Sequence, residues 1–204
     1  MGITGKATYF GITEVGRPRR GVAFVASGAT GGVGSTAGQI AKILGLRMIG
    51  IAGGKEKCDW LVHEDGFDGV IDYRSGDVGA QLSTLCPERN DHFFDSVGRP
   101  VLDEALSRLR SKGRIVLCGA TSWCSQYGRP PGPSRYTALL LQNGRMEGFM
   151  AGDFADRFPE AREPRPDGSV RGSSFRGGMS WSVSRTRRRP SPDCSRAPVS
   201  ESSC

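Results

Sequence analysis

Short apolar runs alternate with amphipathic stretches of about ten residues between residues 21 and 149. The apolar runs predict strands and the amphipathic stretches predict helices. We expect strands at 22–27, 47–52, 69–73, 91–96, 113–120 and 145–150, and helices at 33–45, 55–64, 78–86, 101–110 and 134–144, the last of them capped by Ser134. This alternation indicates a Rossmann-type, doubly wound parallel α/β sheet, whose ligands bind at the carboxyl ends of the strands.

The two ends of the chain differ from this alternating body. Residues 1–20 precede the first expected strand, and KATYFGITEV within them predicts one amphipathic helix that leads into the domain. After residue 163, arginine, serine, proline and glycine dominate, so this segment buries too little apolar area to offset its ordering entropy. We expect a leading helix or linker at 1–20, one folded domain at 21–163 and a disordered tail at 164–204.

Positive charge is concentrated in that tail. The formal net charge is +7, and residues 164–204 hold eight arginines and three acids, a difference of +5. The body is therefore close to neutral. RNA binding by the tail is an alternative, because its arginines lie beside glycine and serine, but only Phe175 and Trp181 could stack on bases. A solvated basic tail is the simpler interpretation, and no nucleic-acid partner is expected.

Cysteine usage and hydropathy restrict the compartment and the chemistry. The six cysteines form no C-x-x-C pair, and the only histidines are His63 and His92. This pattern disfavours a zinc site and is typical of a reducing compartment. The start MGITGKATYF lacks the apolar run of a signal peptide, and no stretch reaches the ~20 apolar residues that span a bilayer. We expect a cytoplasmic protein with no metal and no membrane contact.

The strongest chemical signal is the turn GATGGVG between the first expected strand and the first helix. On a G-x-G-x-x-G template its slots hold Ala29, Gly31 and Gly34. Gly31 would let the backbone approach a pyrophosphate, and Gly34 would let the helix pack closely on the strand. The amides of Gly32, Val33 and Gly34 would lie at the positive end of the helix dipole, where an anion is stabilised. The turn predicts dinucleotide binding, with a plain tight turn as the alternative.

The end of the second expected strand indicates which dinucleotide binds. An NAD site has Asp or Glu there for the ribose 2′-hydroxyl. This chain has Gly53 and Gly54, followed closely by Lys55 and Lys57. A missing acid with nearby cations fits a 2′-phosphate, so the predicted cofactor is NADP and the domain at 21–163 is an NADP-binding domain. A solvated helix start is the alternative interpretation of the lysines.

Several segments together carry a family resemblance: GKATYFGITEVG, GATGGVGSTAGQIAKILG, IGIAGGKEKCDWL, FDGVIDYRS, FFDSVG, GRIVLCGATSW and RPPGPSRYTALLLQNGRMEGFM. In this order and spacing the chain resembles the zinc-independent medium-chain dehydrogenases/reductases, in the branch of the prostaglandin/leukotriene and alkenal reductases, from about residue 2 to about residue 162. The resemblance implies an NADPH-dependent oxidoreductase that reduces the carbon–carbon double bond of α,β-unsaturated aldehydes and ketones.

The resemblance also implies which residues contact the cofactor. The glycine turn would hold the pyrophosphate, Lys57 and Tyr73 the 2′-phosphate end, and Ser96 stands where the family usually has Asn. Residues 118–122 would line the nicotinamide side, with the residues after the last strand nearby. The expected contacts are Gly31, Gly32, Val33, Gly34, Lys57, Tyr73, Ser96, Cys118, Gly119, Ala120, Thr121, Ser122, Phe149 and Met150.

The sequence also departs from the family pattern. The family's N-terminal barrel-like substrate domain and its closing C-terminal elements have no counterpart, so a truncated chain is expected. Cys124 stands where close relatives have a Tyr thought to assist the enone oxygen, and Arg99 replaces a usual Gly. No catalytic residue is assigned, and an NADP-binding protein without turnover stays open as an alternative. The expected small-molecule partner is an enone or enal, and a homodimer stays open.

Overall fold

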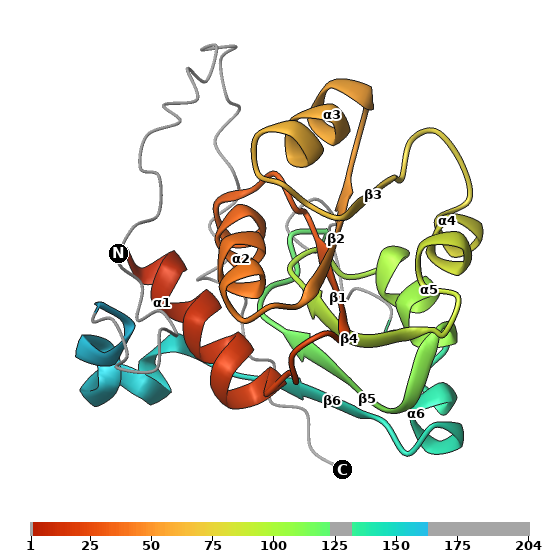
Figure 1. Cartoon of the computed structure of the whole chain (residues 1–204). Coiled ribbons are helices and arrows are strands. Elements are labelled where there is room, and N and C mark those ends of the chain that lie inside the picture. Colours follow the sequence, from red (N-terminus) through yellow and green to blue (C-terminus); the bar gives the residue numbers. More distant parts are fainter. Residues whose placement is uncertain (1, 123–131, 163–204) are drawn as a thin grey trace, which may run out of the picture.

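Six parallel strands form one sheet in the computed structural model, which describes residues 2–122 and 132–162 (Figure 1). The strands are β1 (Ala23–Ser27), β2 (Arg47–Ala52), β3 (Gly69–Asp72), β4 (Asn90–Asp95), β5 (Leu109–Leu117) and β6 (Arg145–Gly148). Their order across the sheet is β3-β2-β1-β4-β5-β6. The order reverses between β1 and β4, which makes the end of β1 the switch point where ligands bind in this fold. The predicted Rossmann-type sheet is confirmed.

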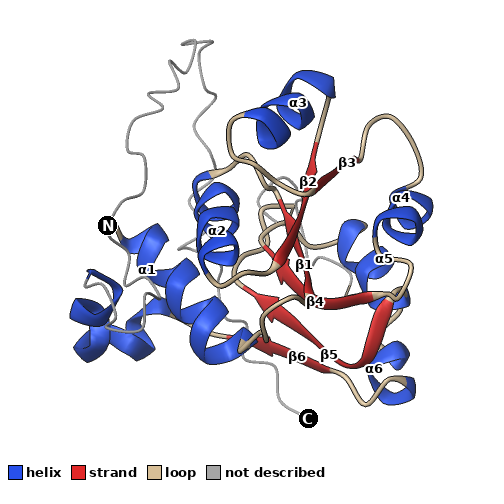
Figure 2. Cartoon of the chain, in the orientation of Figure 1, coloured by secondary structure: helices blue, strands red, loops and turns tan. Residues whose placement is uncertain are grey.

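Helices cover both faces of the sheet (Figure 2). They are α1 (Ile3–Phe10), the π-helical η1 (Gly11–Gly16), α2 (Gly32–Ile43), α3 (Lys55–His63), α4 (Val78–Leu85), α5 (Val101–Ser107), α6 (Thr137–Leu141) and the 3-10 segment η3 (Ala151–Arg162). α1, α2 and η3 pack on one face, and α4, α5 and α6 pack on the other. The fold is therefore doubly wound.

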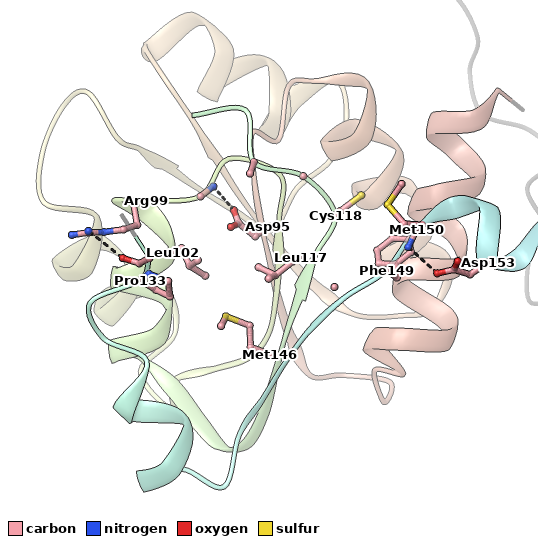
Figure 3. A pocket seen from close by; sticks show the side chains of 15 residues that line it. Asp95, Arg99, Leu102, Leu117, Cys118, Pro133, Met146, Phe149, Met150 and Asp153 are labelled. Atoms are coloured by element: carbon pink, nitrogen blue, oxygen red, sulfur yellow. Dashed lines mark hydrogen bonds between the residues drawn. The ribbon is translucent and has the colours of Figure 1, made fainter. Parts of the chain in front are cut away.

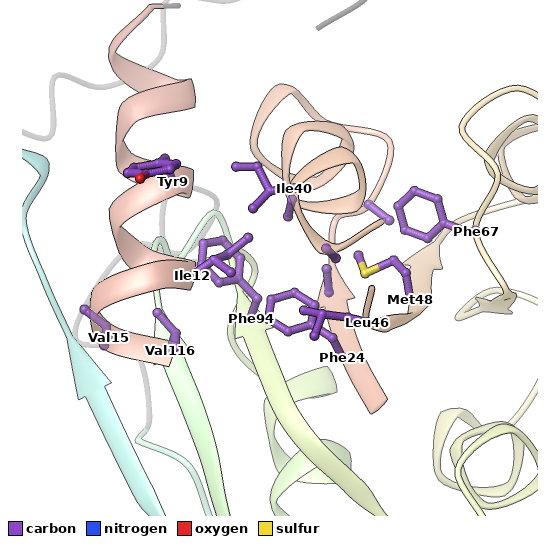
Figure 4. Packing of buried hydrophobic residues seen from close by; sticks show 14 of the residues in the cluster. Tyr9, Ile12, Val15, Phe24, Ile40, Leu46, Met48, Phe67, Phe94 and Val116 are labelled. Atoms are coloured by element: carbon purple, nitrogen blue, oxygen red, sulfur yellow. The ribbon is translucent and has the colours of Figure 1, made fainter. Parts of the chain in front are cut away.

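The core follows the period-two alternation of the buried strands. Phe24 of β1 and Phe94 of β4 point into the cluster under α1 and α2, which Figure 4 shows. The neighbouring residues Val25 and Phe93 point into the cluster on the opposite face. Because both faces of these strands are buried, their sequences are apolar runs, which is why the pattern predicted strands.

The leading helix joins the core of the domain. Phe10 and Ile12 are fully buried, and the Phe10 ring stacks on Phe154 of η3 with ring centroids 4.7 Å apart. A guanidinium nitrogen of Arg157 lies 2.7 Å from a carboxylate oxygen of Glu14. The first and last described segments thus close the same face together. The boundary between residues 20 and 21 stays a prediction.

The largest differences from the expected element boundaries lie around β5 and α6. The helix expected at 101–110 ends at Ser107, and β5 begins at Leu109, because the fully buried Leu109 already pairs with β4. Ser134 does not cap the last helix, which begins at Thr137. Its hydroxyl instead donates a hydrogen bond of 2.9 Å to the carboxylate of Asp103.

The predicted disordered tail at 164–204 and Cys124 lie outside the described residues. In the part of the chain that the structure describes, no helix is long and apolar enough to cross a membrane.

Candidate functional site

The glycine turn connects β1 to α2 at the switch point of the sheet. Gly28 has a φ of +60°, a left-handed conformation that favours glycine. The N–H of Gly31 donates to the carbonyl of Gly28 at 2.9 Å, and the N–H of Ala29 donates to Ile51 of the next strand at 3.0 Å. These bonds fix the turn so that Gly31 caps α2 in an extended conformation. The first amides of a helix lack acceptors within the helix and are available to an anion.

Two glycines at the start of α2 have different surroundings. A Cβ on Gly34 would lie 2.5 Å from the Cα of Ala29 and would also meet the carbonyl oxygen of Gly28, so only glycine lets α2 lie this close to the strand end. A Cβ on Gly32 would be 3.8 Å from the nearest atom, on Thr4. The close packing expected at Gly34 is confirmed, and Gly32 lies at an open surface.

A cleft of about 760 Å³ runs along the carboxyl ends of the strands past this turn. Besides the glycine turn, it is lined by residues that follow β2, β3, β4 and β5. Eight of the fourteen expected contacts lie in it: Gly31, Gly32, Val33, Lys57, Tyr73, Ser96, Thr121 and Ser122. The structure therefore brings together residues that are up to 91 positions apart in the sequence, between Gly31 and Ser122.

One end of the cleft has a cation and an aromatic ring next to the end of β2. A Cβ on Gly53 would lie 2.6 Å from Cζ of the Tyr73 ring, so the ring occupies the space that a side chain at position 53 would need. The exposed Lys57 lines the cleft here and forms no ion pair with any described residue. Lys55 differs, because its ammonium lies 2.6 Å from the carboxylate of Asp59.

The acid that ends β3, Asp72, is held by the backbone. Asp72 accepts hydrogen bonds from the N–H of Gly54 at 2.8 Å and of Arg74 at 2.9 Å. These two amides hold the pKa of Asp72 below its ordinary value. Asp72 is not among the residues that line the cleft, so it does not take the place of the missing acid after β2.

The ends of β4 and β5 are organised around a buried carboxylate. Asp95 is 1% exposed, and its Oδ1 accepts hydrogen bonds from Ser27 Oγ at 2.7 Å and from the N–H groups of Val97 and Gly98 at 3.0 Å. Its backbone carbonyl accepts the N–H of Cys118 at 2.8 Å. Asp95 thus links the carboxyl ends of β1, β4 and β5.

The loops after β4 and β5 are hydrogen-bonded to each other. The carbonyl of Ser96 accepts the N–H and the hydroxyl of Thr121, each at 3.2 Å, and the carbonyl of Val97 accepts the N–H of Ser122 at 3.0 Å. The buried Oγ of Ser96 has no partner among the described residues. This end of the cleft therefore combines a fixed backbone with a hydroxyl that could bind a ligand.

An adjoining apolar pocket of about 590 Å³ takes up five more of the expected contacts (Figure 3). Leu102, Leu117 and Met146 line its inner surface. Burial first, and then the Asp95 carboxylate, raise the pKa of the Cys118 thiol to about 11, so this thiol is protonated at neutral pH. The five expected contacts are Cys118, Gly119, Ala120, Phe149 and Met150. Gly34 lines neither cavity.

Several residues of this site were not among the expected contacts, and three of them lie at strand ends. Asp95 organises the strand ends, and Thr30 and Asp77 line the cleft. Each follows or ends a strand on the side where ligands bind, which was the available signal. Arg99, noted only as a departure from the family, lines both cavities, with its Nε 2.6 Å from Asp103. No group of three or more His, Cys, Asp or Glu side chains that could hold a metal ion occurs within residues 2–122 and 132–162.

Comparisons with known proteins agree with this geometry. The family model described as zinc-binding dehydrogenase matches residues 32–163. The chain is 38% identical over 165 residues to the NADPH-dependent curcumin reductase of Escherichia coli, covering 78% of the chain and 48% of that protein. It is 36% identical over 166 residues to the 2-alkenal reductase (NADP(+)-dependent) of Nicotiana tabacum, covering 80% and 48%.

A solved structure gives the same relationship. The crystal structure of CurA from Vibrio vulnificus in complex with NADPH has a TM-score of 0.72 and 38% identity, covering 78% of this chain and 49% of that one. The chain thus spans about half the length of the relatives it matches. Together, the matched model, these relatives and the Rossmann-type sheet show that the chain belongs to the zinc-binding dehydrogenase family, among its zinc-independent medium-chain dehydrogenases/reductases.

Proposed function

We propose that the cleft binds NADPH and that the protein is an oxidoreductase that reduces the carbon–carbon double bond of α,β-unsaturated aldehydes and ketones. One observation carries the proposal: the glycine turn, the Lys57–Tyr73 end and the Ser96–Ser122 end line a single cleft at the carboxyl edge of the sheet. The relatives support the cofactor, because NADPH is named for the curcumin reductase and is bound in the CurA structure.

The start of α2 would bind the pyrophosphate. Gly31 and Gly32 carry no side chain, so a phosphate can approach the backbone of the turn. The amides of Gly32, Val33 and Gly34 lie in the first turn of a twelve-residue helix, where the helix dipole favours an anion. The packing of Gly34 against Ala29 holds this helix start in place.

The two ends of the cleft would bind the 2′-phosphate of the adenosine and the nicotinamide. Lys57 offers a positive charge to the 2′-phosphate, and Tyr73 excludes the side chain at position 53 that an NAD site would need. The loops at 96–98 and 118–122, fixed by Asp95, would orient the nicotinamide ring beside the apolar pocket. Bound NADPH supplies a hydride, and the apolar lining would exclude water from that side.

A second candidate is an NADP-binding protein without turnover. The observation that favours it is the chemistry of the nicotinamide side, where Cys118 is protonated and one carboxylate oxygen of Asp95 is engaged by three donors. A thiol with a pKa of about 11 is a weak acid, so Cys118 is a poor proton donor at neutral pH. A single-turnover assay of NADPH oxidation by a simple enal separates the two functions, because binding without oxidation would favour the second.

Cofactor preference tests the proposal directly. Lys57→Ala should weaken NADPH binding about 10- to 100-fold, the value of one charge-assisted contact, and leave NADH binding nearly unchanged. The dissociation constants would be measured by fluorescence titration of the nicotinamide. Lys55→Ala is the matched control, since Lys55 pairs with Asp59 outside the cleft. Equal affinities for NADPH and NADH in the unmodified protein would remove the assignment.

A further inference from the structure

A cavity of about 820 Å³ lies at the opposite edge of the sheet, around the amino ends of β1, β4, β5 and β6. It shares no lining residue with the cofactor cleft, and the five residues of β1 put roughly 16 Å between the two edges at about 3.3 Å per residue. Half of its twelve lining residues are cations, against a single acid, Asp91. We call it the basic pocket; the cations are Arg17, Arg19, Arg110, Lys112, Arg114 and Arg145.

Only part of this positive charge is matched by the protein itself. Arg110 lies 3.1 Å from the carboxylate of Asp91. Arg114 donates to the carbonyl of Val15 at 3.0 Å, and Arg17 forms a long contact of 4.0 Å with Glu14. Three further cations form no ion pair with any residue in the described ranges: Arg19, Lys112 and Arg145.

The backbone holds one of these cations in an unfavourable conformation. Lys112 has a φ of +61°, in the left-handed region where glycine is the unstrained residue. Its N–H donates to the carbonyl of Gln142 at 2.6 Å, which fixes the turn against the segment before β6. Asn143, also in the lining, has a φ of +49°. Backbone strain of this kind is found mainly at ligand sites. Replacing the strained residue would stabilise the fold, but a functional role keeps the residue in place.

A buried and unpartnered histidine adds an independent observation. His92 lines the basic pocket and is 8% exposed, and its Nδ1 has no hydrogen-bond partner among the described residues. Burial first lowers its pKa, Arg114 lowers it further and Asp91 opposes them, giving about 4. The ring is therefore neutral at neutral pH and keeps one N–H to donate. A buried polar atom without a partner calls for a ligand or a water.

We propose that the basic pocket binds a multiply charged phosphate compound of small size. Its volume lies within the range of small-molecule sites, and its unmatched cations would repel one another without an anion. Guanidinium groups bind phosphate oxygens in a bidentate manner. The proposal is independent of cofactor binding in the cleft, since the two cavities have no residue in common.

The test uses the full, ¹⁵N-labelled chain saturated with NADPH, titrated with inorganic pyrophosphate at constant ionic strength. Amide resonances of Lys112, Gly113 and Arg145 should shift, while those of the glycine turn should not. Arg145→Gln and Lys112→Gly should each weaken pyrophosphate binding about 10-fold, the lower value for a charge-assisted contact. Lys55→Gln, on an exposed helix start, should bind pyrophosphate like the unmodified chain.

Stability separates a binding role from a structural one. Lys112→Gly removes the left-handed strain and should keep or raise the melting temperature while pyrophosphate affinity falls. Shifts confined to residues 28–34 would overturn the proposal. An unchanged pyrophosphate affinity in the double variant that combines Arg145→Gln and Lys112→Gly would overturn it too. Displacement of pyrophosphate by a short RNA but not by inorganic phosphate would assign the surface to nucleic acid and overturn it as well.

Discussion

At the scale of single residues, we expect alanine to have opposite effects on stability at the two glycines Gly32 and Gly34 at the start of α2. Gly34→Ala should lower the free energy of unfolding by roughly 1–3 kcal/mol, the range for an overpacked site. The reason is that the new methyl would lie 2.5 Å from the Ala29 Cα, a backbone atom that cannot move aside without shifting the turn. Urea denaturation followed by circular dichroism measures the loss.

Gly32→Ala is the matched control two positions away. The methyl there meets nothing closer than 3.8 Å, so unfolding should be unchanged or slightly harder, since alanine favours a helix over glycine. NADPH binding should nevertheless weaken, because Gly32 lines the cleft. Equal stability of the two variants would contradict the close packing of α2 on the strand end.

Substitutions at Gly53 and Tyr73 should change the preference between NADPH and NADH. Gly53→Asp alone should weaken NADPH binding at least about 10-fold, because a carboxylate would face the 2′-phosphate. It should not yet improve NADH binding, since the Tyr73 ring fills the space beside position 53. Adding Tyr73→Ala should let the carboxylate reach the ribose and improve NADH binding. Titrations with both dinucleotides check this, and a gain for NADH in the single variant would contradict the steric role of Tyr73.

At the scale of elements, one carboxylate joins α5 to the segment before α6. Asp103 accepts the N–H of Ser134 at 2.7 Å and of Arg135 at 3.2 Å, and the Nε of Arg99 at 2.6 Å. Burial raises its pKa, but the hydrogen bonds from Ser134, Arg135 and Arg99 outweigh burial and hold the pKa below its ordinary value of 3.8. The charged form is therefore the one that ties these elements together.

Asp103→Asn should lower the free energy of unfolding at pH 7 by roughly 1–3 kcal/mol, because amide N–H groups lose a charged acceptor. Because the pKa of Asp103 is lower in the folded protein than in the unfolded chain, its carboxylate stabilises the fold above pH 3.8, the unfolded value. This stabilisation is lost as the pH falls through the folded pKa. The difference between the variant and the unmodified chain should thus shrink at pH 3. Asp59→Asn, which removes an exposed pair with Lys55, should cost less than about 1 kcal/mol. An undiminished difference at pH 3 would refute the linkage.

The same elements show why some boundaries could be predicted and others could not. β2 matches the expected 47–52 because a run of apolar residues buried on both faces is visible in the sequence. Gly45, with a φ of +66°, directly follows Leu44, the C-cap of α2, in the position where a left-handed glycine is typical. The start of β5 and the start of α6 depend on the burial of Leu109 and on the acceptor Asp103, contacts between distant segments that no local pattern contains.

At the scale of the whole molecule, the parallel sheet decides what the sequence could predict of the site. All strands end at one edge, where the predicted doubly wound sheet places its ligand. The family resemblance implied the fourteen expected contacts, and thirteen of them line the two cavities at that edge. The basic pocket was not expected, because its cations come from three separate segments, before β1, at the start of β5 and at the start of β6. The homodimer stays a prediction; β6 pairs with β5 alone among the described strands and forms one edge of the sheet.

We expect the acid stability of the whole fold to depend on the buried His92. Burial lowers the pKa of His92 from 6.5 to about 4, with Arg114 lowering it and Asp91 raising it. Below pH 6.5 the unfolded chain binds a proton at His92 that the folded protein does not bind, which lowers the free energy of the unfolded state. Stability should therefore be complete above pH 6.5 and fall as the pH declines to about 4, by roughly 3 kcal/mol at 1.36 kcal/mol per unit.

His92→Leu should flatten this decline, because leucine fills the buried site beside Phe24 and binds no proton. The measurement is urea denaturation at pH 7, 5.5 and 4.5 in a phosphate-free buffer, so that an anion in the basic pocket does not contribute. His63→Gln serves as the control, since His63 is exposed on α3 and its loss should leave the pH dependence as it is. A decline that is equally steep in His92→Leu would show that other groups bind the proton, and would place the acid sensitivity of the fold outside this end of the sheet.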